Sequence, residues 1–345
     1  MTMQNSGHVQ PALPTATLAR GLEVGVDLRL AAVAAALTAG SPIAEAEHAL
    51  VTTTRTYLRS YADHPAIRWL KAAVERTWFL SVAMQTVQLG SPPTFTAPPQ
   101  EDIPFFVLRD FAEPAARDIA PHLAAFWNDA QLATLFEQQV PLWAEVVADT
   151  AGILAGLDIV GFEEQFFGLF PYHPVVVPLI NLVPTAMNGV GVANQHETYA
   201  VCCRLSRDGQ QIHPLPVIEL AQHESSHPVL EHVLQRFPAV PAACAFLEET
   251  HPATGRFAMI YDSLESRWTE TFVRASTWFF LKEIGRDQEA AEHIQRHTSQ
   301  GARMIEPFVR ALTPWWQERR AGRAPGLDQV LGQFPDWLHA TQIDR

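Results

Sequence analysis

The stretch PLPVIELAQHESSHPVLEHVLQ, residues 214–235, decides how the rest of the chain is interpreted. Pro214 and Pro216 favour the first turn of a helix, because a proline there fixes φ and has no amide to leave unpaired. The stretch therefore predicts a helix that begins at residue 214 and runs to about residue 235. Inside it lies the pattern His223-Glu224-Ser225-Ser226-His227, which has the form H-E-x-x-H.

The spacing of this motif has a chemical reason. Residues four apart lie on one face of a helix, so the imidazoles of His223 and His227 can reach one zinc ion at about 2.0–2.1 Å each. Glu224 can then accept a proton from a zinc-bound water, whose pKa falls to about 7. Random placement of residues at this composition would give only about 0.04 such matches. The alternative is two polar histidines on a solvated helix face.

A catalytic zinc ion needs a third protein ligand. Five downstream carboxylates are candidates, namely Glu248, Glu249, Asp262, Glu265 and Glu270. We favour Glu270, because its aromatic neighbours indicate a largely buried helix and a buried carboxylate needs a partner. Arg274, four residues further on, could be that partner instead of a metal. Glu265 could serve as the second member of a capping box over Asp262–Glu265, where a helix that runs to Gly285 begins.

Further polar residues have weaker indications. Hydrolysis needs a donor for the developing oxyanion, and Tyr261 is our preferred catalytic candidate, with Tyr199 and Arg274 as alternatives. A second histidine pair, His293 and His297, has the same spacing but no adjacent base. We expect that pair to lie on a solvated helix face.

The remaining sequence predicts an α+β fold that is predominantly helical. Residues 1–20 are expected to form a flexible tail and 21–156 a helical N-terminal region. Residues 157–345 would form the region that carries the motif, either as a separate domain or as part of one continuous domain. Residues 174–180 are β-branched and bounded by prolines, which predicts a strand near a sheet edge. Residues 198–205 predict a second strand, whose edge could pair with an extended peptide.

Composition limits the choice of partners and compartment. The chain has 345 residues and a formal charge of −13, which argues against a general nucleic-acid binder. No apolar run approaches the roughly 18 residues of a membrane span. An odd set of only three cysteines, two of them adjacent, favours the cytoplasm over a disulfide-forming compartment. Export is the minority alternative, because the apolar stretch Leu28–Gly40 resembles a signal peptide but lacks a basic segment before it.

An H-E-x-x-H helix followed tens of residues later by a helical glutamate resembles the gluzincin metallopeptidases. More specifically, the chain resembles an uncharacterised bacterial family that is known only as a domain of unknown function. Three stretches carry this resemblance: Val26–Leu37 with Tyr61–Ala66, His223–Pro228, and Trp268–Ala275. The resemblance implies a zincin-like catalytic half with a short sheet, preceded by the helical region.

The resemblance also implies an activity, that of a zinc metallopeptidase acting on a peptide or protein substrate. His223, His227 and Glu270 would bind Zn²⁺ and Glu224 would be the base. Pro228 departs from the common gluzincin helix, and we expect the helix to kink or end there. Two other hypotheses remain: a non-catalytic zincin-like domain that binds metal or protein partners, and a helical structural protein with a chance motif. The sequence indicates neither the cleavage specificity nor the oligomeric state.

Overall fold

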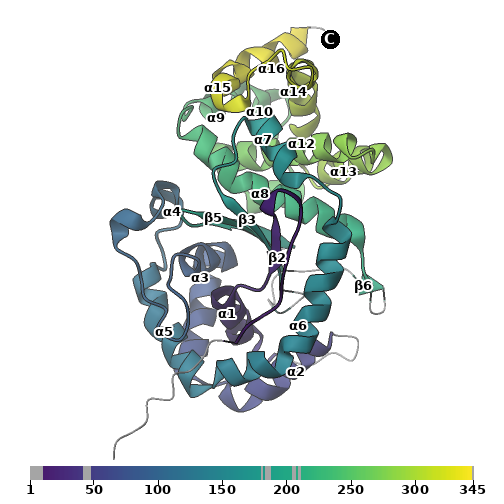
Figure 1. Ribbon diagram of the computed structural model, residues 1–345. Helices are drawn as coiled ribbons and strands as arrows, with labels where there is room; N and C mark the ends of the chain where they lie inside the picture. Colours follow the sequence, from purple (N-terminus) through teal and green to yellow (C-terminus); the bar gives the residue numbers. More distant parts are fainter. Residues whose placement is uncertain are drawn as a thin grey trace, which may run out of the picture. The chain divides into compact units, whose positions relative to one another are not determined.

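The computed structural model describes residues 11–41, 48–179, 182, 188–203, 207–208 and 211–343. As expected, the fold is α+β and predominantly helical, with one mixed five-stranded sheet (Figure 1). The chain divides into two compact units. The first comprises residues up to Leu18, Glu23–Ala155 and Val175–Val217, and the second comprises Ala19–Leu22, Gly156–Pro174 and Ile218–Arg345. Residues 175–217 thus join the N-terminal helices rather than the motif region, and the first strand of this segment pairs with a strand at residues 23–25.

The five-stranded sheet belongs to the first unit. Its strands are β1 (Thr15–Thr17), β2 (Glu23–Gly25), β3 (His173–Pro178), β4 (Gly189–Ala193) and β5 (Glu197–Cys202), in the order β1-β2-β3-β5-β4. β2 runs parallel to β3, whereas the β1–β2 and β4–β5 pairs are antiparallel. Residues 15–17, expected to belong to a tail, therefore form an edge strand. A short separate hairpin consists of β6 (Arg207–Asp208) and β7 (Gln211–Ile212).

Both predicted strands exist, but neither lies at an edge. β3 is the middle strand, because Val175 and Val176 pair with residues of β2, which the sequence did not mark as a strand. Pro174 and Pro178 lie near the two ends of β3. β5 lies between β3 and β4, so the edge that we expected to accept a peptide is already paired.

Helices complete the first unit. They are α1 (Leu28–Thr38), α2 (Ala49–Tyr57), α3 (Pro65–Thr86), α4 (Phe105–Asp110), α5 (Ala116–Asp129) and α6 (Leu132–Leu154), with short 3₁₀ turns at Leu58–Tyr61 and Gln100–Asp102. The carboxylate of Asp27 accepts hydrogen bonds from the first amides of α1. Leu30–Thr38 are all buried, and α1 lies beside α3 (Figure 1). The apolar stretch that resembles a signal peptide is thus a core helix of this structure.

The second unit is built around α12. Its helices are α7 (Ile159–Phe167), α8 (Pro214–Leu234), α9 (Val240–Ala243), α10 (Phe246–Thr250), α11 (Gly255–Ile260), α12 (Leu264–Glu283), α13 (Asp287–Ser299), α14 (Ile305–Arg320), α15 (Leu327–Val330) and α16 (Phe334–Ile343), with 3₁₀ turns at Ala19–Gly21 and Leu331–Gln333. α12 packs against α7, α9, α13 and α14. Its Trp268 and Phe272 stack on each other and contact Phe308 and Phe334. Such aromatic burial fixes α12 as the central element of this unit.

The structure settles where two of the predicted helices begin or end, namely the start of α12 and the end of α8. A capping box does begin α12, but Ser266, not Glu265, reciprocates the bonds of Ser263. α8 continues past Pro228 to Leu234, so the helix does not end after the second histidine as one of our alternatives required.

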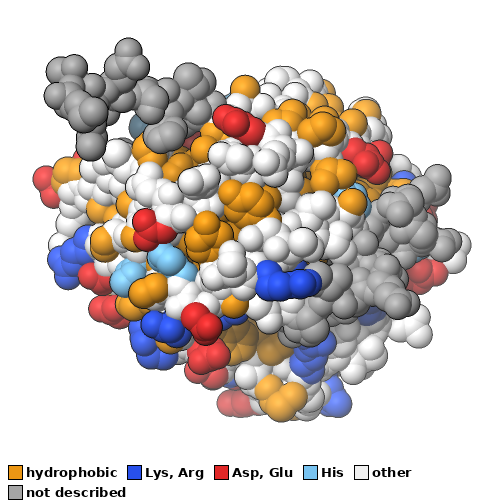
Figure 2. Space-filling view, turned by 90° about the horizontal axis from the view of Figure 1, so that it is seen from below, with side chains coloured by type: hydrophobic (Ala, Val, Ile, Leu, Met, Phe, Trp, Pro, Cys, Tyr) orange, Lys and Arg blue, Asp and Glu red, His pale blue; other side chains and the backbone are white. Residues whose placement is uncertain are grey.

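Surface properties agree with the composition. On the face shown in Figure 2, acidic and basic side chains are interspersed with hydrophobic ones, and the described residues form no continuous basic patch there. Within the described part of the chain, no helix is both long enough and apolar enough to cross a membrane.

Candidate metal centre

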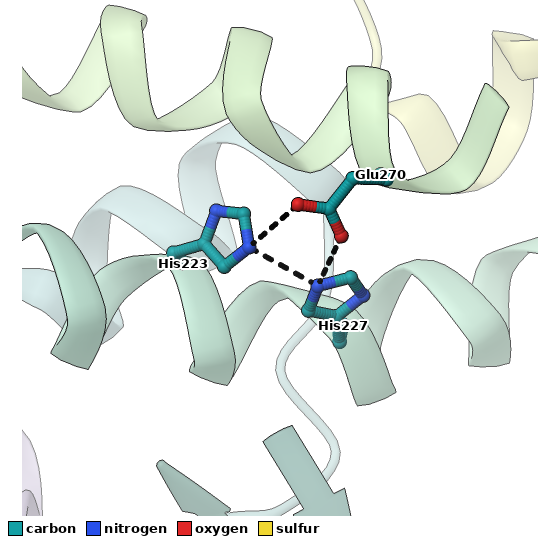
Figure 3. A group of neighbouring side chains, drawn as sticks. All are labelled: His223, His227 and Glu270. Atoms are coloured by element: carbon teal, nitrogen blue, oxygen red, sulfur yellow. Dashed lines mark hydrogen bonds and ion pairs between the residues drawn. The ribbon is translucent and has the colours of Figure 1, made fainter. Parts of the chain in front are cut away.

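Two helices of the second unit bring the predicted ligands together. His223 and His227 project from α8 toward Glu270 of α12, as Figure 3 shows. The two Nε2 atoms are 3.3 Å apart. His223 Nε2 lies 3.5 Å from Oε1 of Glu270, and His227 Nε2 lies 3.4 Å from Oε2. Among the described residues, these three side chains form the cluster whose ligand atoms could hold one metal ion.

The spacing of these atoms suits a small tetrahedral ion. Nitrogen and oxygen ligands at about 2.0–2.1 Å from a tetrahedral zinc ion lie about 3.3–3.4 Å from one another. The separation of the two Nε2 atoms, 3.3 Å, matches that edge length. The two nitrogens lie 3.5 and 3.4 Å from different oxygens of Glu270, and one ligand atom from each of the three residues lies within 4.8 Å of the other two. If both imidazoles donated an Nε2 proton to Glu270, those two protons would also face each other. A cation among the three groups relieves that conflict, so the donor set fits a metal.

The electrostatics keep Glu270 ionised. Burial alone would raise the pKa of this carboxyl, but Arg274 and the two histidines outweigh burial and hold the pKa well below its usual range. Burial would likewise lower the pKa of His227, yet its interaction with Glu270 raises it. The site therefore presents a fixed negative charge, flanked by two imidazoles that must lose any extra proton before they bind a metal.

Arg274 is a partner of Glu270 as well, so the salt bridge that the sequence offered as the alternative to a metal is present beside the two histidines. Its Nε and Nη2 lie 2.8 and 2.7 Å from Oε1 of Glu270, and both side chains are buried. The guanidinium also lies over the ring of Phe257, 5.0 Å from its centroid. Since Arg274 occupies Oε1, Oε2 is the oxygen better placed to bind a cation.

The other predicted site residues fall into two groups. Glu224 is 6% exposed and lies on α8 beside the first histidine. Tyr261 lies next to Arg274, and burial together with the nearby Glu270 carboxylate raises its pKa, which keeps its hydroxyl protonated. Tyr199, by contrast, belongs to the first unit, where its hydroxyl bonds to Arg29 and Glu197. Of the rejected carboxylates, Glu248 accepts hydrogen bonds from Arg267.

The expectation for the second histidine pair was wrong. His293 is only 2% exposed, and its Nε2 donates to the carbonyl of Arg274. Arg274 Nη1 lies 2.9 Å from Nδ1 of His297. Because arginine only donates, Nδ1 must accept, and the ring proton of neutral His297 sits on Nε2. The i, i+4 spacing indicates that both histidines lie on one face of α13. It does not indicate that this face is buried, which follows only from the packing of α13 against α12.

Sequence reasoning also missed a buried network that joins α7, α8 and α12. Glu163 of α7 and Gln222, Ser226 and Ser276 are all fully buried and hydrogen-bonded together. Burial raises the pKa of Glu163 to about 8. Nothing in the sequence around Glu163 distinguishes it from the exposed Glu164 that follows.

Comparison of the chain with protein-family models, with curated proteins and with solved structures gives no match. The resemblance to the gluzincins therefore stays a prediction from the motif.

Proposed function

We propose that this chain is a zinc-dependent hydrolase of the gluzincin type that cleaves peptide bonds. The observation that supports the proposal is the convergence of His223, His227 and Glu270, whose ligand atoms lie within 4.8 Å of one another. Two histidines and one glutamate form a known zinc donor set that leaves a coordination position open.

The residues around the cluster support hydrolysis over other metal chemistry. Two histidines and a carboxylate also bind iron(II) in oxygenases, so the donor set alone does not identify the metal. Glu224 favours hydrolysis, because the H-E-x-x-H motif uses the glutamate after the first histidine as a general base, and Glu224 is buried. When bound, zinc would polarise the substrate carbonyl and lower the pKa of water toward about 7.

Each protein group then has a defined role. Glu224 would accept a proton from the attacking water and transfer it to the leaving nitrogen. Tyr261, protonated and close to Glu270, would donate a hydrogen bond to the oxygen that gains negative charge. Arg274 would hold Glu270 in one orientation through its two bonds to Oε1.

The first experiment is elemental analysis of purified wild type beside His223→Ala and Glu270→Ala. One zinc per chain in wild type, lost in both variants, would support the ligand set. Iron in place of zinc would refute the proposal that the chain is a zinc hydrolase. Zinc retained by Glu270→Ala would refute the assignment of Glu270 as the third ligand. A peptide-library cleavage screen with wild type and Glu224→Gln follows. Metal binding without cleavage of any peptide would favour the non-catalytic, zincin-like alternative.

A further inference from the structure

The buried network beside α8 connects three helices. Ser226 Oγ donates to Oε1 of Glu163 at 2.7 Å, and Gln222 Nε2 reaches the same oxygen at 3.0 Å. Gln222 Nε2 also lies 2.8 Å from Ser226 Oγ and 3.2 Å from Ser276 Oγ. All four side chains are fully buried. The bonds thus join α7, α8 and α12 through groups that have no access to bulk water.

The position of these groups in the sequence relates them to the metal centre. Gln222 immediately precedes His223, and Ser226 immediately precedes His227. The network therefore holds α8 at both of its ligand positions. Ser276 belongs to α12, the helix that supplies Glu270. The same few hydrogen bonds consequently join the two helices that contribute all three ligands.

Two buried oxygen atoms without a hydrogen-bond partner indicate the protonation state of Glu163 that the network requires. Oε2 of Glu163 and Oε1 of Gln222 have no hydrogen-bond partner among the described residues. While Glu163 is ionised, its Oε2 can only accept hydrogen bonds, as Oε1 of Gln222 always does. Burying two acceptors without donors lowers the stability of the fold. A proton on Oε2 would remove the buried negative charge of Glu163 and leave Oε1 to accept from Ser226 and Gln222. The raised pKa of Glu163, about 8, agrees with a neutral acid at this position.

We propose that Glu163 and Ser226 are positioning residues of the metal centre. Glu163 holds α8 against α7, Ser226 also reaches Ser276 of α12 at 3.3 Å between the two Oγ atoms, and together they set the spacing of His223, His227 and Glu270. Glu163 acts as a neutral acid that accepts from Ser226 and Gln222. This inference rests on the proposed function in so far as the cluster must bind a metal. Hydrogen-bonded groups behind the ligands typically change metal affinity by about 10–100-fold when they are removed.

The chain offers a matched control within the motif itself. Ser225 is as buried as Ser226, at 2% exposure against 0%. Its hydroxyl donates to the carbonyl of Ala221 in its own helix and takes no part in the network. Ser225→Ala and Ser226→Ala therefore remove the same atom from neighbouring residues, but only Ser226→Ala removes a bond between helices.

The experiment measures Zn²⁺ affinity by competition with a chromophoric chelator, and the coordination geometry from the visible spectrum of the Co²⁺-loaded protein. We expect Ser226→Ala to weaken Zn²⁺ binding at least about tenfold and to alter the Co²⁺ spectrum, while Ser225→Ala stays near wild type. Glu163→Gln introduces a neutral side chain of the same shape and should keep the Zn²⁺ affinity and the Co²⁺ spectrum of wild type. Glu163→Leu cannot form the hydrogen bonds and should weaken Zn²⁺ binding and alter the Co²⁺ spectrum. Val309→Ala, in α14, controls for a general loss of stability.

The outcomes separate the two proposals. If wild type binds Zn²⁺ and Ser226→Ala matches Ser225→Ala in affinity and spectrum, the positioning role is refuted while the proposed function stands. If Glu163→Gln weakens binding as much as Ser226→Ala does, the neutral-acid form is refuted. If Val309→Ala weakens binding equally, the effect is one of stability and the inference fails. If wild type binds neither Zn²⁺ nor Co²⁺, the proposed function fails and the inference with it.

Discussion

Replacing Glu163 by glutamine should remove a pH-dependent loss of stability from the metal-free protein. The carboxyl is fully buried, and burial is the largest cause that raises its pKa from 4.5 to about 8; its bonds to Ser226 and Gln222 and the charge of His227 act in the opposite direction. Between these two values the folded protein keeps a proton that the unfolded chain releases. The free energy of unfolding therefore falls as pH rises through this window.

The magnitude follows from the two pKa values. Each pKa unit corresponds to about 1.4 kcal/mol, so the full difference from 4.5 to about 8 is worth about 5 kcal/mol. Between pH 5.5 and 7.5, the wild type should lose about 3 kcal/mol relative to Glu163→Gln. A glutamine side chain does not titrate. Any change in packing therefore shifts the free energy of unfolding of Glu163→Gln by the same amount at every pH. The difference between the two proteins in the slope of this free energy against pH then reports the carboxyl of Glu163.

The assay is urea unfolding of chelator-treated protein, followed by tryptophan fluorescence at several pH values. Glu164→Gln is the control, because Glu164 is the next residue of α7 but is 47% exposed and paired with Arg20 at the surface. Its effect on the slope should be small, since exposed ion pairs contribute about 1 kcal/mol or less. Parallel curves for wild type and Glu163→Gln would refute the argument, because they would mean that Glu163 is ionised in the folded protein.

Three further predictions concern the site and α12. Glu224→Gln should keep the metal but lower any peptide hydrolysis by about 10²–10⁴-fold, measured as initial rates at equal metal content; unchanged rates would exclude Glu224 as the base. Arg274→Met should lower the unfolding free energy of the metal-free protein by about 3–5 kcal/mol, because Glu270 is left buried without its main counter-charge. Zinc should restore part of that loss, and unfolding with and without zinc tests this. Ser263→Ala should cost about 1 kcal/mol, because Ser263 caps α12; a matching loss in Glu265→Ala would argue against that cap.

The parts of the site that could be read from the sequence depend on local geometry. One helical turn brings His223 and His227 to the same face whatever surrounds them, so the pair needed no tertiary information. Glu270 was chosen because its neighbours indicated burial, and the structure places it against both histidines. His293 could not be assigned correctly, since an i, i+4 pair has the same spacing on a solvated face as on a buried one.

The sequence by itself determined the helix of residues 214–234, the pairing of its two histidines, and the predominantly helical α+β class, because each depends on periodicity and on local steric preference. Only the tertiary structure decided that β3 lies in the middle of its sheet, since residues 23–25 pair with a strand about 150 positions away. It also decided that Glu163 is buried against α8 while Glu164 faces water. Burial and pairing between distant segments are properties of packing, and a local pattern does not encode which distant segment will cover it.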